Sequence, residues 1–147
     1  MGCSVTNPGK YLNMFANRLV NPGSWDTDLL RLTLAGISMT HGCWRMWTHE
    51  VSALSGVIAE QGIGFSDAIA WAITINESVG ALLLALRLMV WPVGAGMICV
   101  YATGIMLFNI HRGFFVVGAG DAGWEYNALL IMCTIVILWR NRHHKLI

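Results

Sequence analysis

The segment Ala68–Trp91, AIAWAITINESVGALLLALRLMVW, decides how the rest of the chain is interpreted. Its 24 residues are mostly apolar and are enough for a helix that crosses a bilayer with some tilt. Arg87 lies near one end and can extend to the lipid headgroups. Glu77 lies nine residues from the other end, where a carboxylate costs about 2.5–3.5 kcal/mol on insertion scales. We therefore expect Glu77 to be paired, protonated or facing water.

The composition of the chain is that of a protein embedded in lipid. Hydrophobic residues make up 56% of its 147 residues and charged residues only 12%, whereas a soluble domain carries about 25% charged residues. The net charge of +1, without a Lys/Arg cluster facing away from an apolar segment, argues against a nucleic-acid partner. The four cysteines form no Cys-x-x-Cys pair, so neither a disulfide framework nor a zinc site is expected.

Four apolar segments predict an all-α fold, a four-transmembrane-helix bundle. The spans are expected at about 27–47, 68–91, 93–110 and 124–139. Pro92 cannot continue a helix, so we expect it to separate the second and third spans in a tight turn. Residues 27–142 then form one domain, and residues 143–147 form a basic tail.

The parts outside the predicted spans also carry a pattern. Within residues 1–26, apolar side chains recur at helical spacing from Tyr11 to Leu19, which predicts a short amphipathic helix lying on the membrane surface. The loop at 48–67 contains a modestly apolar run, Val51–Ile58, which we expect to reach the headgroup region.

The distribution of Lys and Arg predicts that both termini are cytoplasmic. With an even number of spans, seven basic residues then lie inside and two outside, a bias of the kind that sets membrane topology. The inner residues are Lys10, Arg18, Arg31, Arg87, Arg140, Arg142 and Lys145, and the outer ones are Arg45 and Arg112.

In this topology the ionisable residues of all four helices gather in the outer half of the bundle. They are His41, Arg45, Glu77, His111, Arg112, Glu125 and Tyr126. His41 and Arg45 share one face of the first helix, so Glu77 can pair with Arg45 or accept a hydrogen bond from His41. Two interpretations remain open: a polar joint between helices, or a pocket for a small polar ligand, a quinone headgroup or a proton path.

Haem and metal sites fit the sequence less well. A haem held by His41 and His111 needs both rings at one depth, and the helical rise places them about 9 Å apart in depth. A metal held by these histidines with Glu77 and Glu125 has suitable ligand types but no diagnostic spacing. We expect no metal site.

Three motifs carry a resemblance to a known family. The first is Arg31…His41-Gly42…Arg45, and the second is Glu77-x-x-Gly80 followed by Leu82-Leu83-Leu84 and Arg87. The third is His111-x-Gly113-Phe114-Phe115…Gly123-x-Glu125-Tyr126-Asn127. Over about residues 28–139 the chain resembles the DoxX-like family of small membrane proteins.

The resemblance implies a four-helix membrane bundle with its polar residues towards one side, and we expect it in a bacterial cytoplasmic membrane. Family members are linked to redox complexes, including a subunit of a thiosulfate:quinone oxidoreductase. The resemblance also makes His41, Arg45, Glu77, His111, Glu125 and Tyr126 the candidate functional positions.

Our leading hypothesis is a non-catalytic accessory subunit that contacts lipid and other integral membrane subunits of a redox complex and positions a partner or a quinone. The first alternative is a quinone-linked oxidoreductase subunit in which Glu77, with His41 or Tyr126, binds the ring oxygens. The second is a small carrier or channel.

Overall fold

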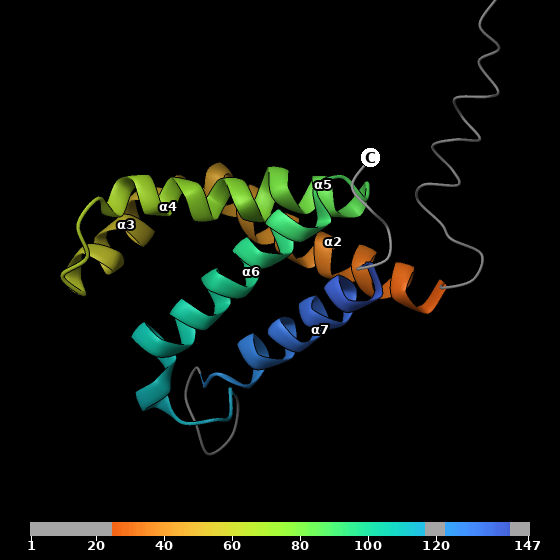
Figure 1. Ribbon diagram of the computed structural model, residues 1–147. Coiled ribbons are helices and arrows are strands. Elements are labelled where there is room, and N and C mark those ends of the chain that lie inside the picture. Colours follow the sequence, from red (N-terminus) through yellow and green to blue (C-terminus); the bar gives the residue numbers. More distant parts are fainter. Residues whose placement is uncertain (1–24, 117–122, 142–147) are drawn as a thin grey trace, which may run out of the picture.

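The computed structural model describes residues 25–116 and 123–141, and every regular element in these ranges is a helix (Figure 1). The all-α prediction is therefore confirmed for the described part of the chain. The amphipathic helix expected from Tyr11 to Leu19 lies outside the described residues. The basic tail at 143–147 also lies outside them.

The first described helix, α2, runs from Trp25 to Trp47. Its first turn carries Asp26 and Asp28 and its last turn carries Arg45, so the charges complement the helix dipole at both ends. Arg45 is thus held on a helix of 23 residues rather than on a loop.

The predicted loop at 48–67 instead folds into a helical hairpin with the next segment. Helix α3 spans Val51–Glu60, and α4 spans Ser66–Ile75. The two helices pack through a small apolar cluster of Val51, Ile58 and Ala70. The apolar run expected at the headgroups is therefore a regular helix that covers one side of α4.

Most of the segment Ala68–Trp91 lies in an unbroken helical stretch with a wider turn in its middle. Helix α4 continues through the π-helical turn η1, Asn76–Gly80, into α5, Ala81–Ala85. Together they make an apolar stretch of 20 residues from Ser66 to Ala85, long enough to cross a membrane. Glu77 lies on η1, and turns of this type are frequent at functional sites.

The predicted turn at Pro92 is wrong. The chain reverses direction at 86–89, where Arg87 and Met89 adopt left-handed backbone conformations. Helix α6 begins at Val90 and runs to Gly104. Pro92 lies in its first turn, where a residue without an N–H loses no helical hydrogen bond.

Two further turns extend α6, and a last helix returns along it. The π turn η2, Ile105–Asn109, and the 3₁₀ turn η3, Ile110–Arg112, complete a 23-residue stretch that is also long and apolar enough to cross a membrane. Helix α7, Glu125–Asn141, lies beside α6 (Figure 1). The approach is close at Gly94, where a Cβ atom would lie 2.7 Å from the Leu138 side chain.

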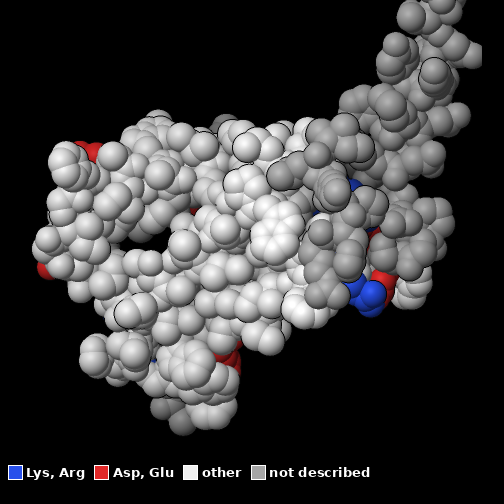
Figure 2. Space-filling view, in the orientation of Figure 1, with Lys and Arg blue, Asp and Glu red and all other residues white. Residues whose placement is uncertain are grey.

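The helices converge at one end of the molecule and diverge at the other (Figure 1). The main apolar core, which includes Leu34, Leu84, Met97 and Ile137, joins α2, α5, α6 and α7. At the opposite end the main chains of the α3–α4 hairpin and η2 diverge, and the Phe108 side chain of η2 packs against the hairpin. Figure 2 shows an opening in the molecular surface there, between the hairpin and the end of α6.

A buried ionic cluster of Asp28, Arg31 and Arg87 joins α2 to the end of α5 where the helices converge. The Arg31 side chain is fully buried and donates to the carbonyl oxygens of Leu84, at 3.1 Å, and of Ala85, which lie at the end of α5. Arg31 and Arg87 both form ion pairs with Asp28. Arg87 therefore turns back into the protein, and the expectation that it extends to the lipid headgroups is wrong.

Candidate functional site

Glu77 forms an ion pair with Arg45 across the interface of α2 and η1. The Arg45 Nη1 atom lies 2.6 Å from Glu77 Oε2 and also donates to Thr74 Oγ1 at 3.3 Å. The Glu77 side chain is 9% exposed and that of Arg45 is 20% exposed. Of the states expected for a carboxylate at this depth, the structure shows the paired one.

The helices come close enough for this pair because α2 carries a glycine at the contact. A Cβ atom on Gly42 would lie 2.8 Å from the Ser78 nitrogen and 2.9 Å from the Glu77 carbonyl carbon. The main chain cannot move aside as a flexible side chain can. Gly42 therefore sets the spacing that lets Arg45, one turn further along α2, reach Glu77.

The ion pair forms part of the wall of a pocket of about 450 Å³. Most of the wall is apolar and comes from the α3–α4 hairpin and from the end of α6, for example Ile58, Ile73 and Phe108. The polar residues of the wall come from α2, η1, α6 and α7. They are His41, Arg45, Glu77, Tyr101, Thr103, Tyr126 and Asn127.

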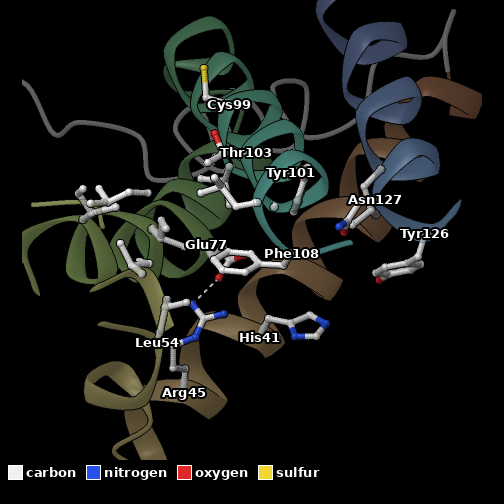
Figure 3. A pocket seen from close by; sticks show the side chains of 18 of the residues that line it. His41, Arg45, Leu54, Glu77, Cys99, Tyr101, Thr103, Phe108, Tyr126 and Asn127 are labelled. Atoms are coloured by element: carbon white, nitrogen blue, oxygen red, sulfur yellow. Dashed lines mark hydrogen bonds and ion pairs between the residues drawn. The ribbon is translucent and has the colours of Figure 1, made fainter. Parts of the chain in front are cut away.

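Figure 3 shows how the labelled side chains are arranged around this pocket. The dashed line joins Arg45 on α2 to Glu77 on η1, and His41 lies on the same helix as Arg45. Tyr126 and Asn127 enter from α7 at the other side of the view. The pocket is therefore amphipathic, with charged and other polar groups on the walls made by α2, η1, α6 and α7.

A buried hydrogen bond supports the wall between α2 and α6. The hydroxyl groups of Ser38 and Tyr101 lie 2.9 Å apart. Ser38 is one turn before His41 on α2, and Tyr101 is 7% exposed while still lining the pocket. This bond holds α6 against α2 close to the ion pair.

Four of the seven predicted site residues line the pocket: His41, Arg45, Glu77 and Tyr126. His111 and Arg112 are exposed on η3, and neither belongs to the pocket wall. Glu125 accepts a hydrogen bond at 3.1 Å from the main-chain N–H of Val116, so it ties the start of α7 to the preceding segment. The predicted cluster is thus divided: four of its residues line the pocket, and His111, Arg112 and Glu125 lie outside the pocket wall.

The wall residues that were not predicted from the sequence include Tyr101, Thr103, Phe108 and Asn127. The first three lie in the third predicted span, 93–110, which has no charged residue. In such a span the sequence alone does not show whether a hydroxyl or aromatic side chain lines a pocket or packs in the core. Asn127 stands directly after Tyr126 in the third motif, so that motif contained the signal. Within residues 25–116 and 123–141, no group of three or more His, Cys, Asp or Glu side chains is arranged to hold a metal ion.

Comparison with known proteins identifies the family. The family model named DoxX matches residues 27–111, more than half of the chain. The chain belongs to the DoxX family. The resemblance seen in the motifs is confirmed, and together with the two long apolar helices it makes this DoxX protein a membrane protein. No match was found among the curated proteins or the solved structures.

The DoxX match includes both partners of the ion pair. It runs from α2 to the first residues of η3 and so contains His41, Arg45, Glu77 and Phe108. Tyr126 and Asn127 on α7 lie beyond the matched residues. The charged side of the pocket thus lies within the family match, and α7 completes the pocket from outside it.

The chemistry of the pocket suits a neutral molecule with polar oxygens. Arg45 and Glu77 neutralise each other, so this pair offers no net charge to a ligand. A charged ligand would therefore lose its hydration without gaining an opposite charge from the pair. Arg45 makes its bonds to Glu77 and Thr74 through Nη1. Its other N–H groups have no partner among the described residues and can donate to an oxygen acceptor.

Proposed function

We propose that this DoxX protein is a four-helix membrane protein whose spans are α2, the stretch from α4 to α5, the stretch from α6 to η3, and α7. The two long apolar stretches support two of these spans directly. Helix α2 has 23 residues and α7 has 17, which at about 1.5 Å per residue approach the thickness of a bilayer core. The charge distribution favours a topology with both termini on the cytoplasmic side, and we propose a bacterial cytoplasmic membrane as the location.

We infer that the protein is an accessory subunit of a redox complex and that its pocket holds a quinone. The observation that carries this proposal is the amphipathic pocket, an apolar cavity of about 450 Å³ with the Arg45–Glu77 pair in its wall. Cavities of this size and character are typical of sites for small ligands. A quinone head is neutral and planar and has carbonyl oxygens that accept hydrogen bonds.

The donors required by such a head are present on two sides of the pocket. Arg45 can donate from α2, and Tyr126 and Asn127 can donate from α7. The apolar wall from Ile58 to Ile73 suits an isoprenoid chain, and the opening beside the α3–α4 hairpin offers that chain a route outwards (Figure 2). Other membrane subunits of the complex would contact the exposed apolar faces of the helices.

One observation favours a more active role. The Glu77 carboxylate lies in the pocket wall itself, so it could take part in proton exchange with a bound quinol. Under this alternative the protein is a quinone-reactive subunit, and the Glu77→Gln variant would stop turnover of the complex without preventing binding or assembly.

The test is purification from native membranes in a mild detergent, followed by extraction of bound lipids and mass measurement of the complex. We expect a quinone at near-stoichiometric amount and co-purifying redox subunits. A monomer that carries no quinone and binds no added short-chain benzoquinone would contradict the proposal. A Glu77→Gln variant that assembles and binds quinone, but whose complex no longer oxidises quinol, would favour the quinone-reactive alternative.

A further inference from the structure

Phe108 joins two parts of the pocket wall that are well separated in the sequence, η2 and the α3–α4 hairpin. It lies on the π turn η2, at the end of α6, and lines the pocket. It also packs against the apolar cluster of Val51, Ile58 and Ala70 in the α3–α4 hairpin. Its side chain therefore bridges the pocket between two parts of the molecule that diverge at this end (Figure 1).

The ring is placed where a planar ligand would meet it. Phe108, Arg45 and Glu77 all belong to the wall of the same pocket, and Figure 3 labels the three side chains around it. Tyr101, Tyr126 and His41 contribute further rings to that wall. A planar head among these side chains can make face and edge contacts that a flexible alkyl chain cannot make.

Both π turns border the pocket. Glu77 lies on η1 and Phe108 lies on η2, so the charged group and the ring come from the two wider turns in the described chain. Turns of this type frequently mark functional sites. Their presence on both sides of one cavity is a second reason to assign the two residues to one ligand.

We propose that Phe108 is the specificity residue of the pocket and that it selects a planar, conjugated head over a flexible amphiphile. The ring of the ligand stacks on Phe108 while one of its oxygens accepts a hydrogen bond from Arg45. The inference rests on the proposed function in that it names the ligand class of the same pocket. It applies equally to a quinone and to an aromatic head that is not redox-active.

The experiment measures the affinity of the full chain in detergent or nanodiscs for three probes. They are a short-chain benzoquinone, a redox-inactive dialkoxybenzene of the same size, and decanol. Phe108→Leu removes the ring and keeps apolar bulk. The matched control is Phe65→Leu, because Phe65 is 90% exposed and lies outside the pocket wall.

We expect Phe108→Leu to weaken both planar probes about 3- to 10-fold, the range of a ring–ring contact, and to leave decanol unchanged. Phe65→Leu should change none of the three. Phe108→Tyr keeps the ring face and should keep the affinity for planar probes, which also serves if Phe108→Leu does not fold. Equal affinities of wild type and Phe108→Leu, an equal loss for all three probes, or a loss in Phe108→Tyr would overturn the inference.

The outcomes separate the inference from the proposed function. If the dialkoxybenzene binds in a Phe108-dependent manner and the quinone does not bind, the inference stands and the quinone proposal falls. If the quinone binds equally to wild type and Phe108→Leu, the quinone proposal stands and the inference falls. If wild type binds decanol and neither planar probe, both are overturned.

Discussion

Arg45 on α2 forms an ion pair with Glu77 on the neighbouring turn η1, with 2.6 Å between Nη1 and Oε2. The two residues are 32 positions apart in the chain, and the contact is made on a π turn. The pair neutralises an acidic group in the middle of a long apolar stretch of the protein. It is also part of the wall of the pocket, so it links the stability of the fold to the candidate site.

The first prediction concerns this pair. Glu77→Ala leaves the Arg45 guanidinium without its carboxylate, and Arg45→Met leaves Glu77 without its cation. Each single variant should lose stability, up to about 3–5 kcal/mol if the pair were fully buried and less here because Arg45 is 20% exposed. Thermal unfolding in detergent measures the loss, with Glu60→Ala, an exposed acidic residue at the end of α3, as the control.

A double variant, Arg45→Met with Glu77→Met, completes the cycle. Because both charges are removed together, it should be more stable than either single variant. If the losses of the two single variants simply add, the two side chains do not interact in the folded protein, and the pair cannot be what stabilises Glu77 in the apolar core.

The second prediction concerns the glycine that permits the contact. Gly42→Ala places a Cβ atom 2.8 Å from the Ser78 main-chain nitrogen, which must push α2 away from η1 at a cost of about 1–3 kcal/mol. Gly36 lies on the same helix, and a Cβ atom added there would have no neighbouring atom within 4 Å. Gly36→Ala should therefore gain up to about 1 kcal/mol from helix propensity. Opposite shifts of the midpoint of thermal unfolding would show that close packing, and not helix propensity, decides at Gly42.

The third prediction concerns the buried cluster at the converging end. Arg31→Lys keeps the charge but loses the planar group that contacts Asp28 and the carbonyl oxygens of Leu84 and Ala85 together. We expect a loss of several kcal/mol, of the order known for broken buried pairs. Arg140→Lys is the matched control, because the pair of Arg140 and Asp26 is 59% exposed on both sides and should contribute little. Equal effects of the two substitutions would contradict the structural role of Arg31.

The fourth prediction uses two native cysteines to test whether the pocket is occupied. Cys99 and Cys43 are both exposed, but only Cys99 lines the pocket. In single-cysteine variants, a bound quinone should slow the reaction of Cys99 with a maleimide and leave that of Cys43 unchanged. Labelling of Cys99 that is insensitive to saturating ligand would show that the ligand binds elsewhere.

The long helices could be predicted from the sequence because their signal is local, whereas α3 lies in the segment 48–67 that was expected to be a loop. Long apolar runs, the acidic residues at the start of α2 and the family motifs are all properties of neighbouring residues. The turn at Pro92 was misplaced because proline is compatible with the first turn of a helix as well as with a break. The choice between them depended on the left-handed conformations that the chain adopts at Arg87 and Met89.

The candidate site could be predicted only in part. The sequence marked His41, Arg45, Glu77 and Tyr126 because ionisable groups are conspicuous against an apolar background. It also marked His111, Arg112 and Glu125, which lie outside the pocket. The depth of a residue along a helix can be counted from the sequence. Whether a residue at the end of a helix points into the pocket or away from it depends on how the helices pack, and this is why these three were misplaced.

By itself the sequence determined that the chain is helical, that it is apolar enough for lipid and that it belongs to the DoxX family, because composition and short-range pattern suffice for each of these. Only the tertiary structure decided that Glu77 pairs with Arg45, that Arg31 and Arg87 share Asp28, and that Phe108 closes on the α3–α4 hairpin. The ion pairs of Arg45 with Glu77 and of Arg87 with Asp28 join residues 32 and 59 positions apart, and the Phe108 contact joins helices that meet only after packing. Their geometry follows from close approaches such as that at Gly42, which no local pattern of residues specifies.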